Sequence, residues 1–323
     1  MTVVDKMKGL WKLQLRLWIA MALLFALVYA VVIVVASFLG IGYFQVYPAL
    51  GIIIVAVQYW LGPKLVEWSM KVNYVTEEQA PDLHRIVRDL AAIANIPKPK
   101  IGVSETPVPN AFAFGRYKRD GRVCVTRGLL NILREDEVKA VLGHELGHIK
   151  HNDMIITTIA SGIPLICYYV GISFLFSRRD NGAGVIIGIL AWIAYFIGQL
   201  IVLFISRVRE YYADQASVEF GNSPDKLASA LYKLVYGASQ SDKEAIKEVK
   251  GSSALFLNDV GNSDFDIHEL SQIDTDGDGN ISPSELAQLK YRKLNLSTWT
   301  KFKEAFSTHP NMLKRMERLS RLL

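Results

Sequence analysis

The longest uncharged stretch of this chain limits what it can fold into. No Asp, Glu, Lys or Arg occurs between Leu17 and Pro63, and two further uncharged stretches follow at Met154–Ser177 and Asn181–Ser206. A helix that crosses a bilayer needs about 20 apolar residues, which each of these stretches can supply. As core helices they would overfill any core that the remaining residues could surround. The sequence therefore predicts a membrane protein and excludes a purely soluble globular chain, a coiled coil and a disordered chain.

Four segments have the composition of membrane-spanning helices: Leu17–Leu39, Tyr47–Leu61, Ile155–Phe176 and Gly184–Ile205. We expect the second to end at Gly62-Pro63. Lys and Arg lie near the predicted cytoplasmic ends of the spans, at positions 6, 8, 12, 16, 64, 71, 150, 207 and 209. The exception is Arg178-Arg179, which lies in the loop between the last two spans, on the opposite side. By the positive-inside rule we expect a multi-pass protein of the cell membrane, with both termini and the residues between the second and third spans in the cytoplasm.

Charge and cysteine content exclude two other classes. The net charge is +5, but the basic residues adjoin the apolar stretches, which is typical of a membrane protein and predicts the lipid bilayer, not a nucleic acid, as partner. The chain has two cysteines, Cys124 and Cys167, too few for a disulfide scaffold.

The predicted spans divide the chain into four parts. Residues 1–63 form an N-terminal arm and a first membrane hairpin, and residues 154–206 form a second hairpin. The polar blocks 64–153 and 207–323 share one compartment, and together they have the length of one domain. We predict that they fold as one unit, with the second hairpin inserted between them.

The first polar block predicts a small mixed domain. Helical spacing of apolar residues covers Glu77–Asn95, and Lys100–Val103 is predicted as a short strand. Ala111–Phe114 and Arg122–Thr126 alternate in polarity around a turn at residues 119–121, which indicates a hairpin. Glu135–Lys150 is predicted as a helix, because acids occupy its first turn and a base its last.

This last helix carries the residues with the clearest chemistry. Residues 144–148 read His-Glu-Leu-Gly-His. Positions i and i+4 lie on one helix face, so His144 and His148 can bind one Zn²⁺ ion. Glu145 lies about 100° around the helix, beside that ion, and can take a proton from a water whose pKa the metal has lowered.

A catalytic zinc needs a third protein ligand. His151 shares the face of the two histidines, but on an unbroken helix positions i and i+7 are about 10 Å apart, so we do not expect it to bind. Glu210, which opens Glu-Tyr-Tyr-Ala-Asp after the last span, is the better candidate. Asp214, one turn on, could accept the free ring N–H of a ligating histidine. The alternative for both acids is a solvated helix face.

These residues, in this order, resemble those of the HtpX family of membrane zinc metalloproteases, which are of the gluzincin type. The resemblance includes Ser-Arg-x-Arg-Glu-Tyr-Tyr-Ala-Asp at residues 206–214, Asn-Ala-Phe-Ala-Phe-Gly at 110–115, and Ser-Thr-His-Pro at 307–310 with Arg315 beyond. It implies an α+β, mainly helical fold: four transmembrane helices and a zincin-type metallopeptidase domain with a small β-sheet.

The resemblance also implies a function and a set of site residues. One zinc ion per chain would be bound by His144, His148 and Glu210, with Glu145 as general base. His309 and Arg315 would lie near the site and steady an oxyanion. A substrate peptide would pair with an edge strand made of Asn110, Ala111, Phe112, Ala113, Phe114 and Gly115. The expected substrates are misfolded or damaged membrane proteins and unfolded polypeptides, as in protein quality control.

Residues 274–285 depart from the family and fit the twelve-residue loop of an EF-hand. The predicted ligands of one Ca²⁺ ion per chain are Asp274, Asp276, Asp278, Asn280, Ser282 and Glu285, and Gly279 is the required turn. We interpret the region of about residues 259–300 as an insertion. Because EF-hands usually pair and no second loop occurs in the sequence, either homodimerisation or packing of this hand against the protease domain is expected.

Two further functions stay open at this point. The chain could be a CAAX-type processing protease, which shares the metal motif. It could also be a catalytically inactive membrane scaffold that binds Ca²⁺.

Overall fold

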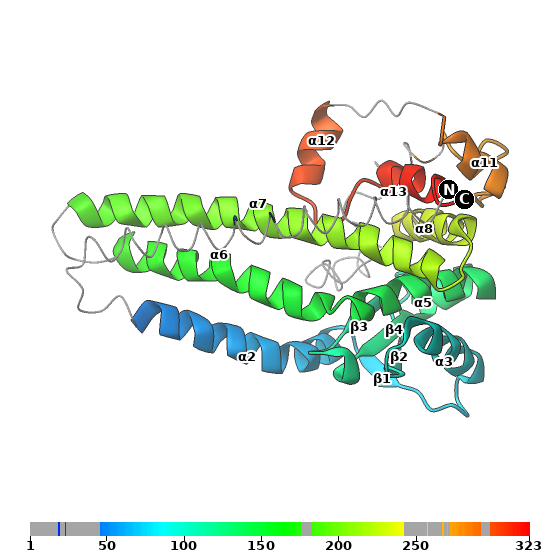
Figure 1. Ribbon diagram of the computed structural model, residues 1–323, viewed down its shortest axis with the longest axis horizontal. Coiled ribbons are helices and arrows are strands. Elements are labelled where there is room, and N and C mark those ends of the chain that lie inside the picture. Colours follow the sequence, from blue (N-terminus) through cyan, green and yellow to red (C-terminus); the bar gives the residue numbers. More distant parts are fainter. Residues whose placement is uncertain are drawn as a thin grey trace. The chain divides into compact units, whose positions relative to one another are not determined.

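The computed structural model describes residues 19, 23, 46–175, 182–241, 257, 267, 270, 272–291 and 298–323 (Figure 1). The described chain divides into two compact units. One unit consists of Pro63–Met154 and Arg209–Leu323, so both polar blocks contribute to it. The other contains Ile155–Val208 and the described residues up to Gly62. Here we call them the catalytic unit and the apolar unit.

A four-stranded sheet lies in the catalytic unit. Its strands are β1 (Val72–Tyr74), β2 (Lys100–Ser104), β3 (Ala111–Phe114) and β4 (Arg122–Thr126), in the order β1-β2-β4-β3. β3 and β4 form the predicted antiparallel hairpin, and β2 runs parallel to β4. The sequence analysis missed β1, because three residues are too few to show a period. β3 is therefore an edge strand, paired with β4 on one side and with no described strand on the other.

Helices cover the sheet and supply most of the core. They are α3 (Pro81–Ala94), α4 (Arg127–Ile132), α5 (Glu135–Lys150), α8 (Pro224–Ser239), α11 (Pro283–Gln288), α12 (Thr298–Ala305) and α13 (Met312–Ser320). α5 has the predicted bounds. α3 begins four residues later than predicted, because Pro81 suits the first turn of a helix. One apolar cluster joins α3, α5, α8, α11 and α13 with the sheet, so these elements form a single core.

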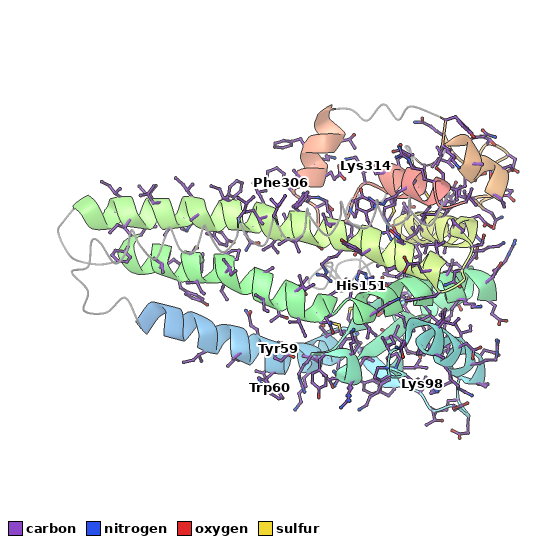
Figure 2. The ribbon with its side chains drawn as sticks, viewed as in Figure 1. Tyr59, Trp60, Lys98, His151, Phe306 and Lys314 are labelled. Carbon is purple, nitrogen blue, oxygen red and sulfur yellow. The ribbon has the colours of Figure 1, made fainter. Side chains whose placement is uncertain are left out.

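The apolar unit consists of long helices. α6 (Asp153–Leu175) begins in the catalytic unit, and α7 (Gly182–Glu219) ends in it. α2 (Val46–Ser69) crosses the boundary at Pro63. Among the described residues, two segments are long and apolar enough to cross a membrane: Asp153–Ile172 and Gly184–Glu219. Side chains project from α7 along its length (Figure 2). In its first half, Trp192 and Phe196 are each 52% exposed. Such surface is costly in water, so it is suited to lipid.

Of the four predicted spans, the third and fourth correspond to α6 and α7. The first lies outside the described residues, apart from Ile19 and Leu23. The second lies in α2, and this helix continues beyond the predicted end of the span, through Pro63 to Ser69. A proline inside a helix removes one hydrogen bond and can be accommodated by its surroundings.

Glu137 links two helices of the catalytic core. It is 2% exposed, and its carboxylate accepts hydrogen bonds from Ser229 Oγ (2.7 Å) and Lys233 Nζ (2.7 Å) of α8, and from the backbone N–H of Arg134 (2.8 Å). The start of α5 is thereby fixed against α8.

We predict that Glu137→Ala destabilises the catalytic unit, because it leaves the Lys233 ammonium without its buried partner. Loss of one member of such a pair costs about 3–5 kcal/mol. Thermal unfolding of the purified chain in detergent measures the effect, with Asp89→Asn, at an exposed position of α3, as control. A melting temperature equal to that of the wild type would contradict the assigned role.

Candidate metal centre

The HELGH helix, α5, is placed by its apolar faces and by its glycines. Val141, Leu142 and Leu146 are buried in the core, which leaves the two histidines on another face. A Cβ atom added at Gly147 would lie 2.8 Å from Ala216 Cβ and 3.1 Å from Ala213 Cα, both on α7. The absence of a side chain at residue 147 therefore lets α7 approach α5 closely. That approach brings Glu210 of α7 to the histidines.

Three acceptor groups from α5 and α7 converge on one point. The Nε2 atoms of His144 and His148 are 3.1 Å apart. His144 Nε2 lies 3.5 Å from Glu210 Oε2, and His148 Nε2 lies 3.5 Å from Glu210 Oε1. Zinc–nitrogen and zinc–oxygen bonds of about 2.0–2.2 Å in a tetrahedron require ligand atoms roughly 3.3–3.6 Å apart. The three groups have nearly this spacing.

Hydrogen bonds at the Nδ1 atoms of the two histidines determine whether their Nε2 atoms act as donors or acceptors. His144 Nδ1 lies 2.9 Å from Asp214 Oδ1, and His148 Nδ1 lies 2.6 Å from Asp153 Oδ2. Ionised carboxylates only accept hydrogen bonds, so each Nδ1 carries the proton and donates it. In neutral rings, both Nε2 atoms then present lone pairs to each other and to Glu210. Three acceptors that face one another need positive charge between them.

Two further observations agree with a cation at this point. Glu210 Oε2 is buried and has no hydrogen-bond partner among the described residues. Burial by itself would lower the pKa of His144, but the neighbouring carboxylates of Asp214 and Glu210 outweigh it and raise that pKa to about 9. The carboxylates thus favour positive charge on this side of α5. Two imidazoles and one carboxylate are a donor set that suits zinc and leaves a fourth position open.

Glu145 lies next to this point without forming part of the triangle. Its side-chain oxygens fall in one group with the ring nitrogens of His144 and His148, all within 4.8 Å of one another. It is 3% exposed, and burial raises the pKa of its carboxyl group. The nearby backbone of Ala113 in β3 partly offsets this rise. A carboxylate with a raised pKa beside a metal is well suited to exchange protons near neutral pH.

Helix α13 and the turn before it bring two further predicted residues to the site. Arg315 is fully buried, and its guanidinium donates to Asp214 Oδ1 (2.6 Å) and Oδ2 (3.0 Å). Its Nη1 atom also lies 3.4 Å from Glu210 Oε2. His309 Nδ1 lies 3.5 Å from the same oxygen, and His309 Nε2 is buried without a hydrogen-bond partner among the described residues.

The predicted substrate strand lies beside the site, because β3 contacts α5. The backbone oxygen of Asn110 accepts from Thr126 N–H (2.9 Å), so this residue faces β4. By the alternation of an antiparallel ladder, the backbone groups of Ala111 and Ala113 face the open edge. Phe112 and Phe114 are buried in a small core beneath the strand. Gly115 has φ 145°, and a Cβ there would lie 2.4 Å from the Asp120 carbonyl oxygen, so this position requires glycine.

Asn110 has a different task from the strand residues after it. It is fully buried, and its side-chain oxygen accepts the backbone N–H of Leu257 (3.1 Å). The carbonyl of Leu257 in turn accepts from Arg315 Nη1 (2.9 Å). Leu257 therefore joins the start of the edge strand to the arginine beside the metal ligands.

His151 and Asp153 show what the sequence analysis excluded and what it missed. His151, labelled in Figure 2, ends α5 and packs its ring against Tyr212, with centroids 5.6 Å apart, so it takes no part in the triangle. Asp153, which holds His148, was missed. The sequence signal that could have found Asp153 was an acidic residue just beyond the end of the predicted helix, from where the chain can turn back to His148.

The acidic loop of residues 274–285 forms a second cluster. The carboxylates of Asp274, Asp276 and Asp278 lie within 4.8 Å of one another. Gly277 and Gly279 have φ angles of 70° and 77°, which glycine adopts readily. Glu285 reaches back across the loop and accepts from the backbone N–H groups of Thr275 (2.7 Å) and Ser282 (2.9 Å). Asn280 Oδ1 is buried without a hydrogen-bond partner in the described structure.

A helix-borne HExxH pair with a distant glutamate, beside the edge strand of a small sheet, defines the metallopeptidase class of site. The family described as Peptidase family M48 matches residues 77–323. The chain therefore belongs to peptidase family M48.

Curated relatives make the likeness more specific. A "Protease HtpX homolog" of Methanothermobacter thermautotrophicus is 60% identical over 245 residues, which are 76% of this chain and 94% of that protein. One of Thermoplasma acidophilum is 31% identical over 310 residues, 92% of each chain. The resemblance to the HtpX family is thereby confirmed.

A solved structure supports the fold. A crystal structure of S. mikatae Ste24p superposes with a TM-score of 0.52 at 17% identity, over 94% of this chain and 67% of that one. At this identity the likeness concerns the fold alone.

We predict that Glu210→Ala purifies without stoichiometric metal, because two imidazoles without the carboxylate leave the ion with too few protein ligands. Metal analysis by mass spectrometry compares it with the wild type, for which one zinc per chain is expected. Glu219→Ala, on the same helix, is the control, since Glu219 pairs with Gln215 away from the histidines. Full zinc content in the Glu210 variant would remove this residue from the ligand set.

Proposed function

We propose that this chain is a membrane-embedded zinc endopeptidase. The observation that carries the proposal is the convergence of His144, His148 and Glu210 on one point, with Glu145 between that point and the open edge of β3. Two candidate membrane helices, α6 and α7, follow the helix of the two histidines, and α7 itself carries Glu210. We place the catalytic unit on the cytoplasmic face, on the distribution of Lys and Arg in the sequence.

Zinc, when bound by His144, His148 and Glu210, would supply a Lewis acid that lowers the pKa of a water and polarises a carbonyl group. Glu145 accepts a proton from the attacking water and later donates it to the nitrogen of the leaving peptide. Its burial and raised pKa suit both directions of transfer. Glu145 thus performs the proton transfers of peptide hydrolysis.

The open edge of β3 would align the substrate. An extended peptide can pair with the outward backbone groups of Ala111 and Ala113, next to Glu145. Main-chain pairing reads little side-chain identity, which suits misfolded or damaged membrane proteins and unfolded chains. Since Asn110 is occupied by Leu257, we assign it to holding the strand and not to direct substrate contact.

His309 and Arg315 have separate parts in this proposal. The Arg315 guanidinium is engaged by Asp214 and Leu257 and lies near Glu210, so it holds the ligand scaffold. The buried Nε2 atom of His309 is the better donor for a developing oxyanion, because no described residue occupies it.

The two other functions are less well supported. A CAAX-type processing role would rest on the structural likeness to Ste24p, which at 17% identity concerns only the fold, whereas the relatives at 31–60% identity carry the HtpX name. An inactive scaffold does not account for the intact set of Glu145 and the metal-binding residues.

We predict that Glu145→Gln retains zinc but loses proteolysis, because glutamine cannot accept the proton. General acid–base groups contribute about 10²–10⁴-fold, so the cleavage rate should fall by at least that factor. The assay follows casein and a misassembled membrane protein, with zinc content measured on the same samples. Proteolysis at the wild-type rate by this variant would refute the mechanism, and preferred cleavage of a prenylated peptide by the wild type would favour the CAAX-type role.

We further propose that residues 274–285 bind one Ca²⁺ ion and modulate the protease. The support is the register of Asp274, Asp276, Asp278, Asn280, Ser282 and Glu285 in the EF-hand pattern, together with the clustering of the three aspartates. Ile281 and Leu286 are buried in the main core with α13. The hand thus packs against the protease domain, one of the two alternatives left by the sequence.

Two physical connections run from this loop to the metal centre. α11 contacts both α8 and α13. α8 holds the start of α5 through Lys233 and Glu137, and α13 holds Asp214 and Glu210 through Arg315. An ion that orders the loop would therefore stiffen both supports of the site.

We predict that Ca²⁺ binds once per chain and that Glu285→Gln weakens it by about tenfold or more, because the residue at the last loop position normally supplies both oxygens to the ion. Isothermal titration with Ca²⁺ measures binding, with Asp89→Asn as control. Proteolysis is compared in calcium-depleted and millimolar-calcium buffer at fixed free zinc. Equal rates would leave the loop a structural role only, and no heat of binding would exclude the site.

A further inference from the structure

Asp153 lies directly behind one of the proposed zinc ligands. It is 2% exposed, and its Oδ2 atom lies 2.6 Å from His148 Nδ1. Its other oxygen, Oδ1, lies 3.1 Å from Nε of Arg209, which is 8% exposed. The three side chains thus form a buried line from the imidazole through the carboxylate to the guanidinium.

The end of α5 makes this contact possible. On a continuous helix, residues five apart are about 140° apart around the axis and cannot meet. Here the helix ends at His151, and Asn152 has φ 56°, a left-handed conformation that asparagine tolerates better than most residues. The chain reverses at this point, and Asp153, the first residue of α6, returns to His148.

A matching line supports the other histidine. His144 Nδ1 contacts Asp214, and Asp214 is held by Arg315. The two imidazoles are therefore each backed by one aspartate and one arginine, although the four supporting residues come from three different helices. Because Arg209 directly precedes Glu210, the line through His148 also joins α5 to the segment that carries the third ligand.

We propose that Asp153, fixed by Arg209, is a positioning residue for His148. Its carboxylate keeps the proton on Nδ1, orients the ring, and raises the basicity of Nε2 toward the metal. Arg209 fixes the carboxylate and connects the first turn of α6 with α7 at the level of Glu210. This inference rests on the proposed zinc site, but it concerns a residue that does not bind the ion.

Metal affinity tests the proposal without relying on proteolysis. Asp153→Asn keeps the shape of the side chain but removes its charge, and we expect zinc affinity to fall by about 10–100-fold. Arg209→Lys keeps the positive charge but loses the planar guanidinium, so an intermediate loss is expected. Both full-length variants, purified in detergent, are titrated with zinc in competition with a chromophoric chelator. The absorption spectrum of the cobalt-loaded protein then reports any change in ligand geometry.

Asp225→Asn is the matched control, because it neutralises another buried carboxylate of the same unit that contacts Ser223 and Lys226 but neither histidine. Reduced zinc affinity and an altered cobalt spectrum in Asp153→Asn, with wild-type values in Asp225→Asn, support the proposal. Wild-type affinity and spectrum in Asp153→Asn, or an equal loss in the control, overturn it. If Asp153→Asn does not fold, Arg209→Lys decides by the same two measurements. Absence of zinc binding by the wild type overturns the proposed function itself, which is a separate result.

Discussion

The catalytic unit depends on three buried acceptors being held against one another. Two imidazole nitrogens at 3.1 Å and a carboxylate at 3.5 Å repel unless positive charge lies between them. The protein maintains this arrangement because each group is fixed from behind: the imidazoles by aspartates, the aspartates by arginines, and the helices by a shared core. The energy of packing thus stabilises a site that favours a metal ion.

Close contact between α5 and α7 determines whether Glu210 reaches the two histidines. Gly147 lies between the histidines' helix and Ala213 and Ala216 of α7, so the motif glycine acts by having no side chain. α7 is also the longest described helix, and it runs without interruption from apolar residues suited to lipid to Glu210. The apolar segment and Glu210 therefore belong to one continuous helix.

The acidic loop of residues 274–285 packs into the same core as the helices around the metal centre. Its flanking apolar residues, Ile273, Ile281 and Leu286, complete the core that α8 and α13 share. α13 bears Arg315 between Leu313 and Met316, which are buried in that core. The acidic loop thereby supports the residues around the metal centre through the core that it shares with α13.

Several features were determined by the sequence alone. Local sequence patterns gave the bounds of α5, β3 and β4, and the HELGH spacing put His144, Glu145 and His148 on one helix, because these properties depend on neighbours within a few residues. The continuation of α2 through Pro63 to Ser69 was not evident from the sequence, since whether a proline ends a helix depends on what packs around it. The position of Glu210 and Asp214 after the last span made them candidates, and a family resemblance was needed to connect His309 and Arg315 with the motif. Only the tertiary structure decided the parallel pairing of β2 with β4, the return of Asp153 to His148, and the burial of Asn110 beneath Leu257. These contacts join residues across a chain reversal, a crossover or more than a hundred positions, and such distances are set by packing and not by local pattern.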